Sequence, residues 1–117
     1  MEIWVNPACS KCRTAVSALD EAGVDYTVRR YLEDPPTVEE LATVVDRLGL
    51  EPWDLARPKE AREAGLTAIA KDAEHRTAWL AGLAANPRAI QRPIITADDG
   101  TTVIARDDET LGSILAH

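Results

Sequence analysis

Two cysteines three positions apart, Cys9 and Cys12, are the residues of this 117-residue sequence best suited to chemistry. An ordinary thiol ionises near pH 8.5, and its thiolate can act as a nucleophile, ligate a metal or exchange disulfides. A zinc site needs two more soft ligands, yet the sequence offers no other cysteine and only His75 and His117. A structural disulfide would close a very short loop in a chain without a secretion-signal pattern. The favoured interpretation is therefore a redox-active or nucleophilic thiol.

The segment around the cysteines predicts a strand, a turn and a helix in that order. β-prone residues at positions 3–5 precede the breaker pair Asn6-Pro7. Apolar residues then recur at helical spacing over positions 10–22, and Gly23 follows as a stop signal. Cys9 is therefore expected at the N-terminus of a helix.

That position should lower the pKa of the Cys9 thiol. Free backbone N–H groups and the positive end of the helix dipole both stabilise a thiolate at a helix N-terminus. Lys11 and Arg13 add positive charge nearby. An alternative for the second cysteine is that only Cys9 reacts, while Cys12 is a small buried residue on the inner face of the helix.

Composition restricts the partners of this chain. The formal net charge is -7, which argues against nucleic acid or a membrane surface as a partner. A small oxyanion remains compatible with this charge, because an acidic surface is largely screened beyond roughly 8 Å. The sequence shows neither a long apolar run nor a signal-peptide pattern, so we expect a cytoplasmic protein whose thiols are kept reduced.

The remaining pattern predicts a single α/β domain over residues 1–117. A strand over residues 24–28 would complete a parallel β-α-β unit. Helices interrupted by prolines form an insertion at about residues 37–86. A capping box at Thr37 and Glu40 begins one of them, and another over residues 73–85 should turn Ala78 and Trp79 inward. A β-β-α unit follows, with its strands near 92–96 and 102–105 and its helix near 108–115. This order is a thioredoxin-like βαβ–ββα mixed sheet with a helical insertion between its halves. Pro93 would enter its strand opposite the cysteines, a place where the prolyl bond is often cis.

Three segments resemble the glutaredoxin-coupled arsenate reductase family, which belongs to a broader group of arsenate reductases and Spx-like proteins. The segments are Asn6–Cys9, Tyr31–Thr37 and Arg92–Ile95, and the similarity covers nearly the whole chain. The resemblance implies that Cys9 is the nucleophile that attacks arsenate.

The resemblance also implies an oxyanion clamp formed by Arg57, Arg92 and Arg106. Arsenate is a dianion near neutral pH, so a thiolate can approach it only where fixed positive charge offsets the repulsion. The arginine side chain is permanently charged and has a planar fork that suits oxyanions. No bound cofactor and no metal are expected. Residues expected to support the site are Asn6, Ser10, Lys11, Arg13 and Pro93.

Two departures from the family pattern concern the thiol. Many of these reductases have a histidine where this chain has Val5, which removes one source of thiol acidification. The typical single-cysteine enzymes lack a cysteine at the position of Cys12. We therefore expect Cys12 to form a disulfide with Cys9, reduced by a thioredoxin- or mycoredoxin-like partner. Alternatively, glutathione with glutaredoxin resolves Cys9, and Cys12 takes no part.

Two other functions compete with arsenate reduction. A general thiol–disulfide oxidoreductase would cycle Cys9 and Cys12 against other disulfides. An Spx-like regulator would bind RNA polymerase and sense oxidation through the same pair. Arg57 and Arg106 favour the reductase, because neither alternative requires them.

Overall fold

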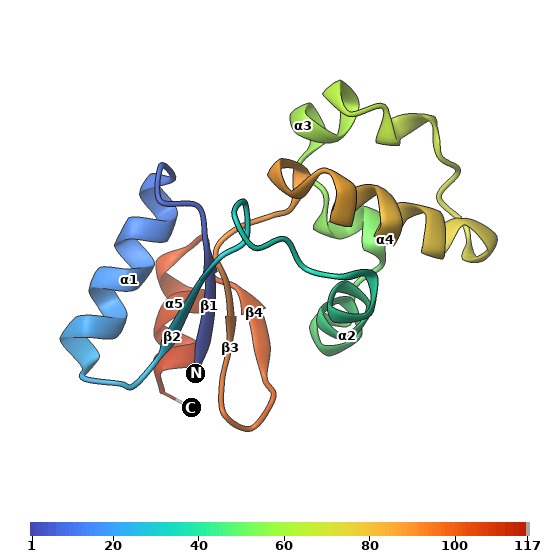
Figure 1. Ribbon diagram of the computed structural model, residues 1–117. Coiled ribbons are helices and arrows are strands. Elements are labelled where there is room, and N and C mark those ends of the chain that lie inside the picture. The colour runs from blue at the N-terminus through green and yellow to red at the C-terminus, as the bar shows by residue number, and fades with distance from the viewer. Residues whose placement is uncertain (117) are drawn as a thin grey trace. The chain divides into compact units, whose positions relative to one another are not determined.

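The computed structural model describes residues 1–116 and comprises two compact units (Figure 1). The first, here called the sheet unit, contains Met1–Asp34 and the chain from Arg92 onward. The second, the inserted unit, contains Pro35–Gln91.

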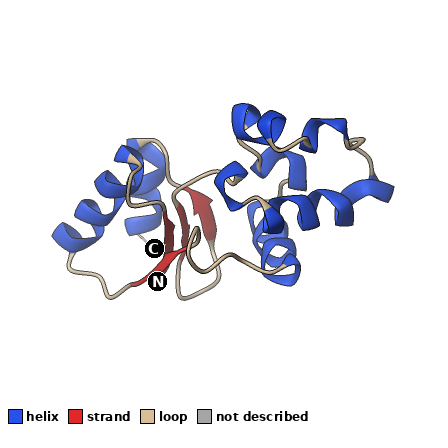
Figure 2. Ribbon diagram, turned by 45° about the horizontal axis from the view of Figure 1, so that its top comes forward, coloured by secondary structure: helices blue, strands red, loops and turns tan. Residues whose placement is uncertain are grey.

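The sheet unit has the mixed α/β architecture expected from the sequence. Its strands are β1 (Glu2–Val5), β2 (Thr27–Arg30), β3 (Ile94–Thr96) and β4 (Thr102–Ile104), and its helices are α1 (Ser10–Ala22) and α5 (Asp108–Leu115). The strand order is β2-β1-β3-β4, drawn in red in Figure 2. β1 is parallel to β2 and antiparallel to β3, and β3 is antiparallel to β4. This is the predicted thioredoxin-like β-α-β and β-β-α arrangement.

The core of the sheet unit lies between one sheet face and the pair α1 and α5, which lie side by side (Figure 1). Alternate strand residues supply the sheet side of this core, because successive side chains in a strand point to opposite faces. The helices contribute residues three to four positions apart. The buried members from both layers include Ile3, Val5, Ile95, Ala15, Leu19, Leu111 and Ile114.

The predicted strand over residues 24–28 is wrong in its position. Gly23 ends α1 in the left-handed conformation, at φ 67°, and the N–H of Val24 donates to the carbonyl of Leu19 at 3.4 Å. Val24 therefore belongs to the helix cap, which is a common way to end a helix. The strand starts at Thr27, extends to Arg30 and forms an edge of the sheet with mostly exposed residues.

The inserted unit is helical and contains α2 (Val38–Leu48), η1 (Pro52–Leu55), α3 (Pro58–Glu63), η2 (Leu66–Ala68), η3 (Ala73–His75), α4 (Arg76–Ala85) and η4 (Pro87–Ala89). The expected capping box begins α2: Thr37 accepts from the N–H of Glu40, and the Glu40 carboxylate accepts from the N–H of Thr37. The helix expected from residue 73 begins instead as the turn η3. Ala78 is exposed on α4, contrary to expectation, whereas Trp79 is buried.

We propose that the two units unfold together as one domain. Each unit holds about half of the chain, a length at which the buried apolar surface gives only marginal stability on its own. Trp4 lies in the sheet unit and Trp79 in the inserted unit. In a urea titration followed by NMR, the native indole N–H signals of both residues should disappear at one midpoint. Two well-separated midpoints would show two independent domains.

Candidate active site

The edge of the sheet at which β1, β2 and β4 end and β3 begins carries polar residues from all four strands. The register of β1 with β2 places Val5 opposite Arg30, so the residues that follow each of them leave the sheet together. β3 is antiparallel to β1, so β3 begins where β1 ends, and β4 is antiparallel to β3, so β4 ends there too. The residue two positions before β3 and the residue two positions after β4 therefore reach the same edge. These edge residues are Asn6, Tyr31, Arg92 and Arg106.

Asn6 organises the loop that carries the first cysteine. The N–H of Cys9 donates to the Asn6 carbonyl at 2.9 Å, and the N–H of Ala8 donates to Asn6 Oδ1 at 3.0 Å. The Asn6 N–H in turn contacts Cys12 Sγ at 3.5 Å. The loop thereby holds Cys9 as the N-cap residue of α1, in the extended conformation that N-caps adopt.

The surroundings of Cys9 favour its thiolate. Burial alone would raise the pKa of this thiol, but hydrogen bonds to the sulfur outweigh burial. The donors are the N–H of Cys12, the Arg92 guanidinium, the Cys12 thiol and the N–H of Lys11, and together they lower the pKa of Cys9 to about 7. The thiolate of Cys9 is therefore more populated at neutral pH than that of an ordinary cysteine, which is the direction expected from the sequence.

The second cysteine is held in the opposite state. Cys12 is buried, and burial raises the pKa of its thiol to about 11. The Asn6 N–H opposes this rise, while the negative charge of Cys9 adds to it. Both cysteines are free thiols. At neutral pH, the pair thus consists of a partly ionised Cys9 and a protonated Cys12 beside it.

Two of the three predicted arginines belong to this edge. The Arg92 guanidinium hydrogen-bonds the Cys9 sulfur, and the peptide bond between Arg92 and Pro93 is cis. Arg106 Nη1 donates to the Arg92 carbonyl oxygen at 2.9 Å. Because a guanidinium has five N–H donors, Arg106 can fix the backbone of Arg92 and still offer donors to an anion.

Arg57, the third predicted arginine, lies in the inserted unit as the N-cap residue of α3. Its Nε lies 3.2 Å from Glu60 Oε2, and its backbone N–H donates to the carbonyl of Ala89 at 2.7 Å. The sheet unit thus brings together Cys9, Cys12, Arg92 and Arg106, while Arg57 is anchored within the other unit.

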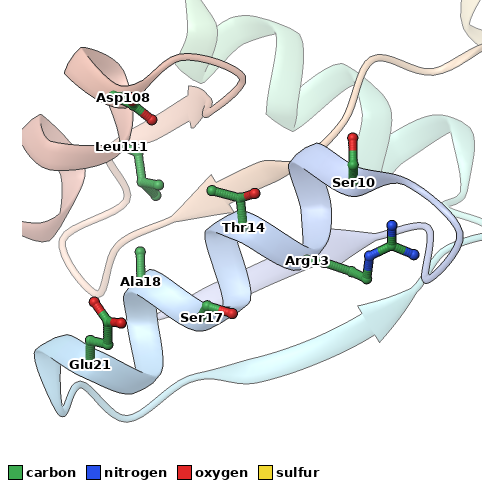
Figure 3. A pocket seen from close by; sticks show the side chains of 8 residues that line it. All are labelled: Ser10, Arg13, Thr14, Ser17, Ala18, Glu21, Asp108 and Leu111. Atoms are coloured by element: carbon green, nitrogen blue, oxygen red, sulfur yellow. The ribbon is translucent and has the colours of Figure 1, made fainter.

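Ser10 and Arg13 line an open groove between α1 and α5, with a volume of about 560 Å³ (Figure 3). Its other lining residues are the polar Thr14, Ser17, Glu21 and Asp108 and the apolar Ala18 and Leu111. Arg13 thus faces a groove whose lining includes neither cysteine, whereas Lys11 acts on the Cys9 sulfur through its backbone N–H.

Sequence reasoning did not identify Tyr31 as a site residue, although this residue begins one of the family-like segments. Its side chain is completely buried, and it follows β2 directly at the edge that carries the cysteine loop. The usable signal was its position after a strand parallel to β1, because parallel neighbours end at the same edge of a sheet.

Within residues 1–116, no group of three or more histidine, cysteine or acidic side chains could hold a metal ion. Among the helices of this described part, none is long and apolar enough to cross a membrane.

The strand order, with a cysteine pair at the start of the first helix, defines a protein of thioredoxin-like fold. The model of the ArsC family matches residues 4–114 of the sequence. The chain belongs to the ArsC family.

Individual relatives agree with this assignment. An uncharacterized protein in the glnII region of Streptomyces viridochromogenes is 58% identical over the full length of both chains. An arsenate reductase of Neisseria meningitidis is 34% identical, covering 98% of this chain and 97% of that protein. The solved structure of an arsenate reductase from Vibrio cholerae is 33% identical, with a TM-score of 0.83 over 97% of this chain and 98% of that one.

The pH dependence of Cys9 alkylation should follow its thiolate. The rate with iodoacetamide is expected to rise with pH through about 7 and to level off above, because only the ionised sulfur reacts. Replacing Arg92 with alanine removes a group that favours the charged form, so the midpoint should move to higher pH. Each unit of upward shift reduces the reactive fraction about tenfold well below the midpoint.

The matched control is Arg47→Ala, which removes an exposed arginine from the last turn of α2. This variant should keep the wild-type midpoint. An unchanged midpoint in Arg92→Ala would show that the guanidinium does not stabilise the thiolate.

Proposed function

We propose that this protein is a thiol-dependent oxidoreductase, and specifically an arsenate reductase. Membership in the ArsC family and the printed names of relatives such as the Neisseria meningitidis protein support this function. The observation that carries it is the hydrogen bond between the Arg92 guanidinium and the Cys9 sulfur. A nucleophile and a permanent positive charge in contact are what attack on a dianion requires.

The first step forms a bond between sulfur and arsenic. The Cys9 thiolate attacks the arsenic of arsenate, and one oxygen accepts a proton and leaves as water. Arg92, Arg106 and Arg57 are proposed to neutralise the oxyanion during this approach, as the family resemblance implies. Arsenic keeps its oxidation state of five in this step, because one ligand has replaced another.

The second step transfers two electrons. A second thiolate attacks Cys9 Sγ, a disulfide forms, and the sulfur–arsenic bond breaks with its electron pair remaining on arsenic. Arsenite then leaves, with arsenic in oxidation state three. We propose Cys12 as the attacking thiol, since it is buried beside Cys9. Its proton must be removed during the attack, because the pKa of Cys12 is raised to about 11 by burial.

An external thiol completes the cycle. A disulfide between Cys9 and Cys12 would be reduced by a thioredoxin- or mycoredoxin-like protein. If glutathione resolves Cys9 instead, glutaredoxin would reduce the mixed disulfide. Either route needs a compartment that keeps thiols reduced, which fits the predicted cytoplasmic location.

The contact between Cys9 and Cys12 favours one alternative, a general thiol–disulfide oxidoreductase. Such an enzyme would reduce protein disulfides and would not need Arg57 or Arg106. The Spx-like regulator predicted as a further alternative would bind RNA polymerase under oxidising conditions, which a pull-down can test.

Arsenite release by cysteine variants tests the proposed chemistry. Cys9→Ser should abolish turnover with every thiol donor, since a hydroxyl does not ionise at neutral pH. Cys12→Ser should lose turnover with a thioredoxin- or mycoredoxin-like donor. Full turnover of Cys12→Ser with those donors would remove Cys12 from the mechanism, and absence of arsenite from the wild type with all donors would contradict the function.

Arginine variants separate the arsenate reductase from the general oxidoreductase. A hydrogen bond to a charged group contributes about 1.5–3 kcal/mol, so Arg57→Ala or Arg106→Ala should lower kcat/KM for arsenate roughly tenfold to a hundredfold. Reduction of a neutral disulfide should change little. Arg62→Ala, at an exposed position on α3, is the matched control. Unchanged turnover of both substrates in Arg57→Ala and Arg106→Ala would favour the general oxidoreductase.

A further inference from the structure

Tyr31 is an unusual residue within the sheet unit. It follows edge strand β2, most of whose residues are exposed, yet none of its own surface is accessible to solvent. The turn after β2 holds it there, because the N–H groups of Glu33 and Asp34 both donate to the carbonyl of Arg30. The aromatic ring is therefore fixed at the edge that carries the cysteine loop.

The hydroxyl of Tyr31 is buried without a hydrogen bond of acceptable geometry to any described residue. Buried polar groups nearly always have a partner, and leaving one unsatisfied is costly. A hydrophobic core position would be filled as well by phenylalanine. The hydroxyl proton therefore points to an acceptor that comes from outside the chain.

The neighbours of this hydroxyl are the groups of the proposed arsenate site. Burial raises the pKa of Tyr31 to about 12, while the Arg92 guanidinium, which lies within hydrogen-bonding reach of the phenol oxygen, opposes this rise. A guanidinium can only donate, so Arg92 leaves the phenol proton without an acceptor. The phenol is thus neutral near pH 7 and keeps its proton to donate. Arg92 lies beside both residues, because its guanidinium also hydrogen-bonds the Cys9 sulfur.

We propose that the Tyr31 hydroxyl donates a hydrogen bond to the tetrahedral oxyanion that Arg92 holds beside Cys9. This inference rests on the proposed function, and it adds a neutral donor to a site otherwise described by charged groups. Arg92 would offset the charge of the anion, while Tyr31 would fix the direction of one oxygen. A phenol fits this role because its donor lies at the end of a rigid ring.

The test measures anion binding without turnover. Phosphate or arsenate should protect Cys9 from iodoacetamide in the wild type, because an anion beside the sulfur blocks its approach. Tyr31→Phe keeps the buried ring and removes only the hydroxyl. The anion concentration giving half-protection should rise about tenfold to a hundredfold, as expected for the loss of a hydrogen bond to a charged group.

The matched control is Tyr26→Phe, which removes a hydroxyl that donates to Asp20 Oδ1 on the surface of the same unit. Its half-protection concentration should equal that of the wild type. The inference is overturned if Tyr31→Phe is protected as well as the wild type. It is also overturned if, without anion, this variant raises the pH midpoint of Cys9 alkylation, because the hydroxyl would then act by holding Arg92 in place.

A third result concerns the proposed function itself. If neither anion protects the wild type, the site does not bind tetrahedral oxyanions, and the arsenate reductase function and the inference fail together. Protection of the wild type with no change in Tyr31→Phe leaves the proposed function intact and refutes the inference alone.

Discussion

The negative charge on the Cys9 sulfur is the constraint on which the rest of the site depends. A partly buried thiolate is unfavourable unless donors replace the water that it has lost. Here, backbone N–H groups at the start of α1 supply one part of that stabilisation, and the Arg92 guanidinium supplies another. The first comes from local sequence and the second from the far end of the chain. The sheet must therefore form before the thiolate is fully stabilised.

The same arrangement gives two chemically identical side chains different roles. Cys9 lies at the helix terminus beside Arg92, and Cys12 is buried one turn later. Their pKa values, about 7 and about 11, differ because one sulfur faces positive charge and the other faces the apolar core. Val5, at the end of β1 just before the cysteine loop, packs in that core, and the groups that lower the pKa of Cys9 include no imidazole.

The parts of the structure that could be predicted from the sequence are those set by neighbouring residues. The position of Cys9, the stop at Gly23 and the capping box at Thr37 depend on a few consecutive residues, and all were predicted. The start of β2 was not, because the helix cap uses Val24 in a way that alternation of apolar residues does not indicate. Tyr31 was missed for a different reason: its importance depends on strand register, which only the folded sheet defines.

The exposed edge strand β2 also affects how copies of the protein meet. An open strand edge offers unpaired backbone groups that can join the sheet of another molecule. β2 ends with Arg29 and Arg30. The Arg29 guanidinium carbon lies 5.4 Å from the centre of the Trp4 ring. The only large apolar residue exposed on β2 is Val28, which is 43% exposed. A second strand brought alongside β2 would have to fit around the long charged side chains of Arg29 and Arg30. Charged residues on an edge strand disfavour such sheet extension.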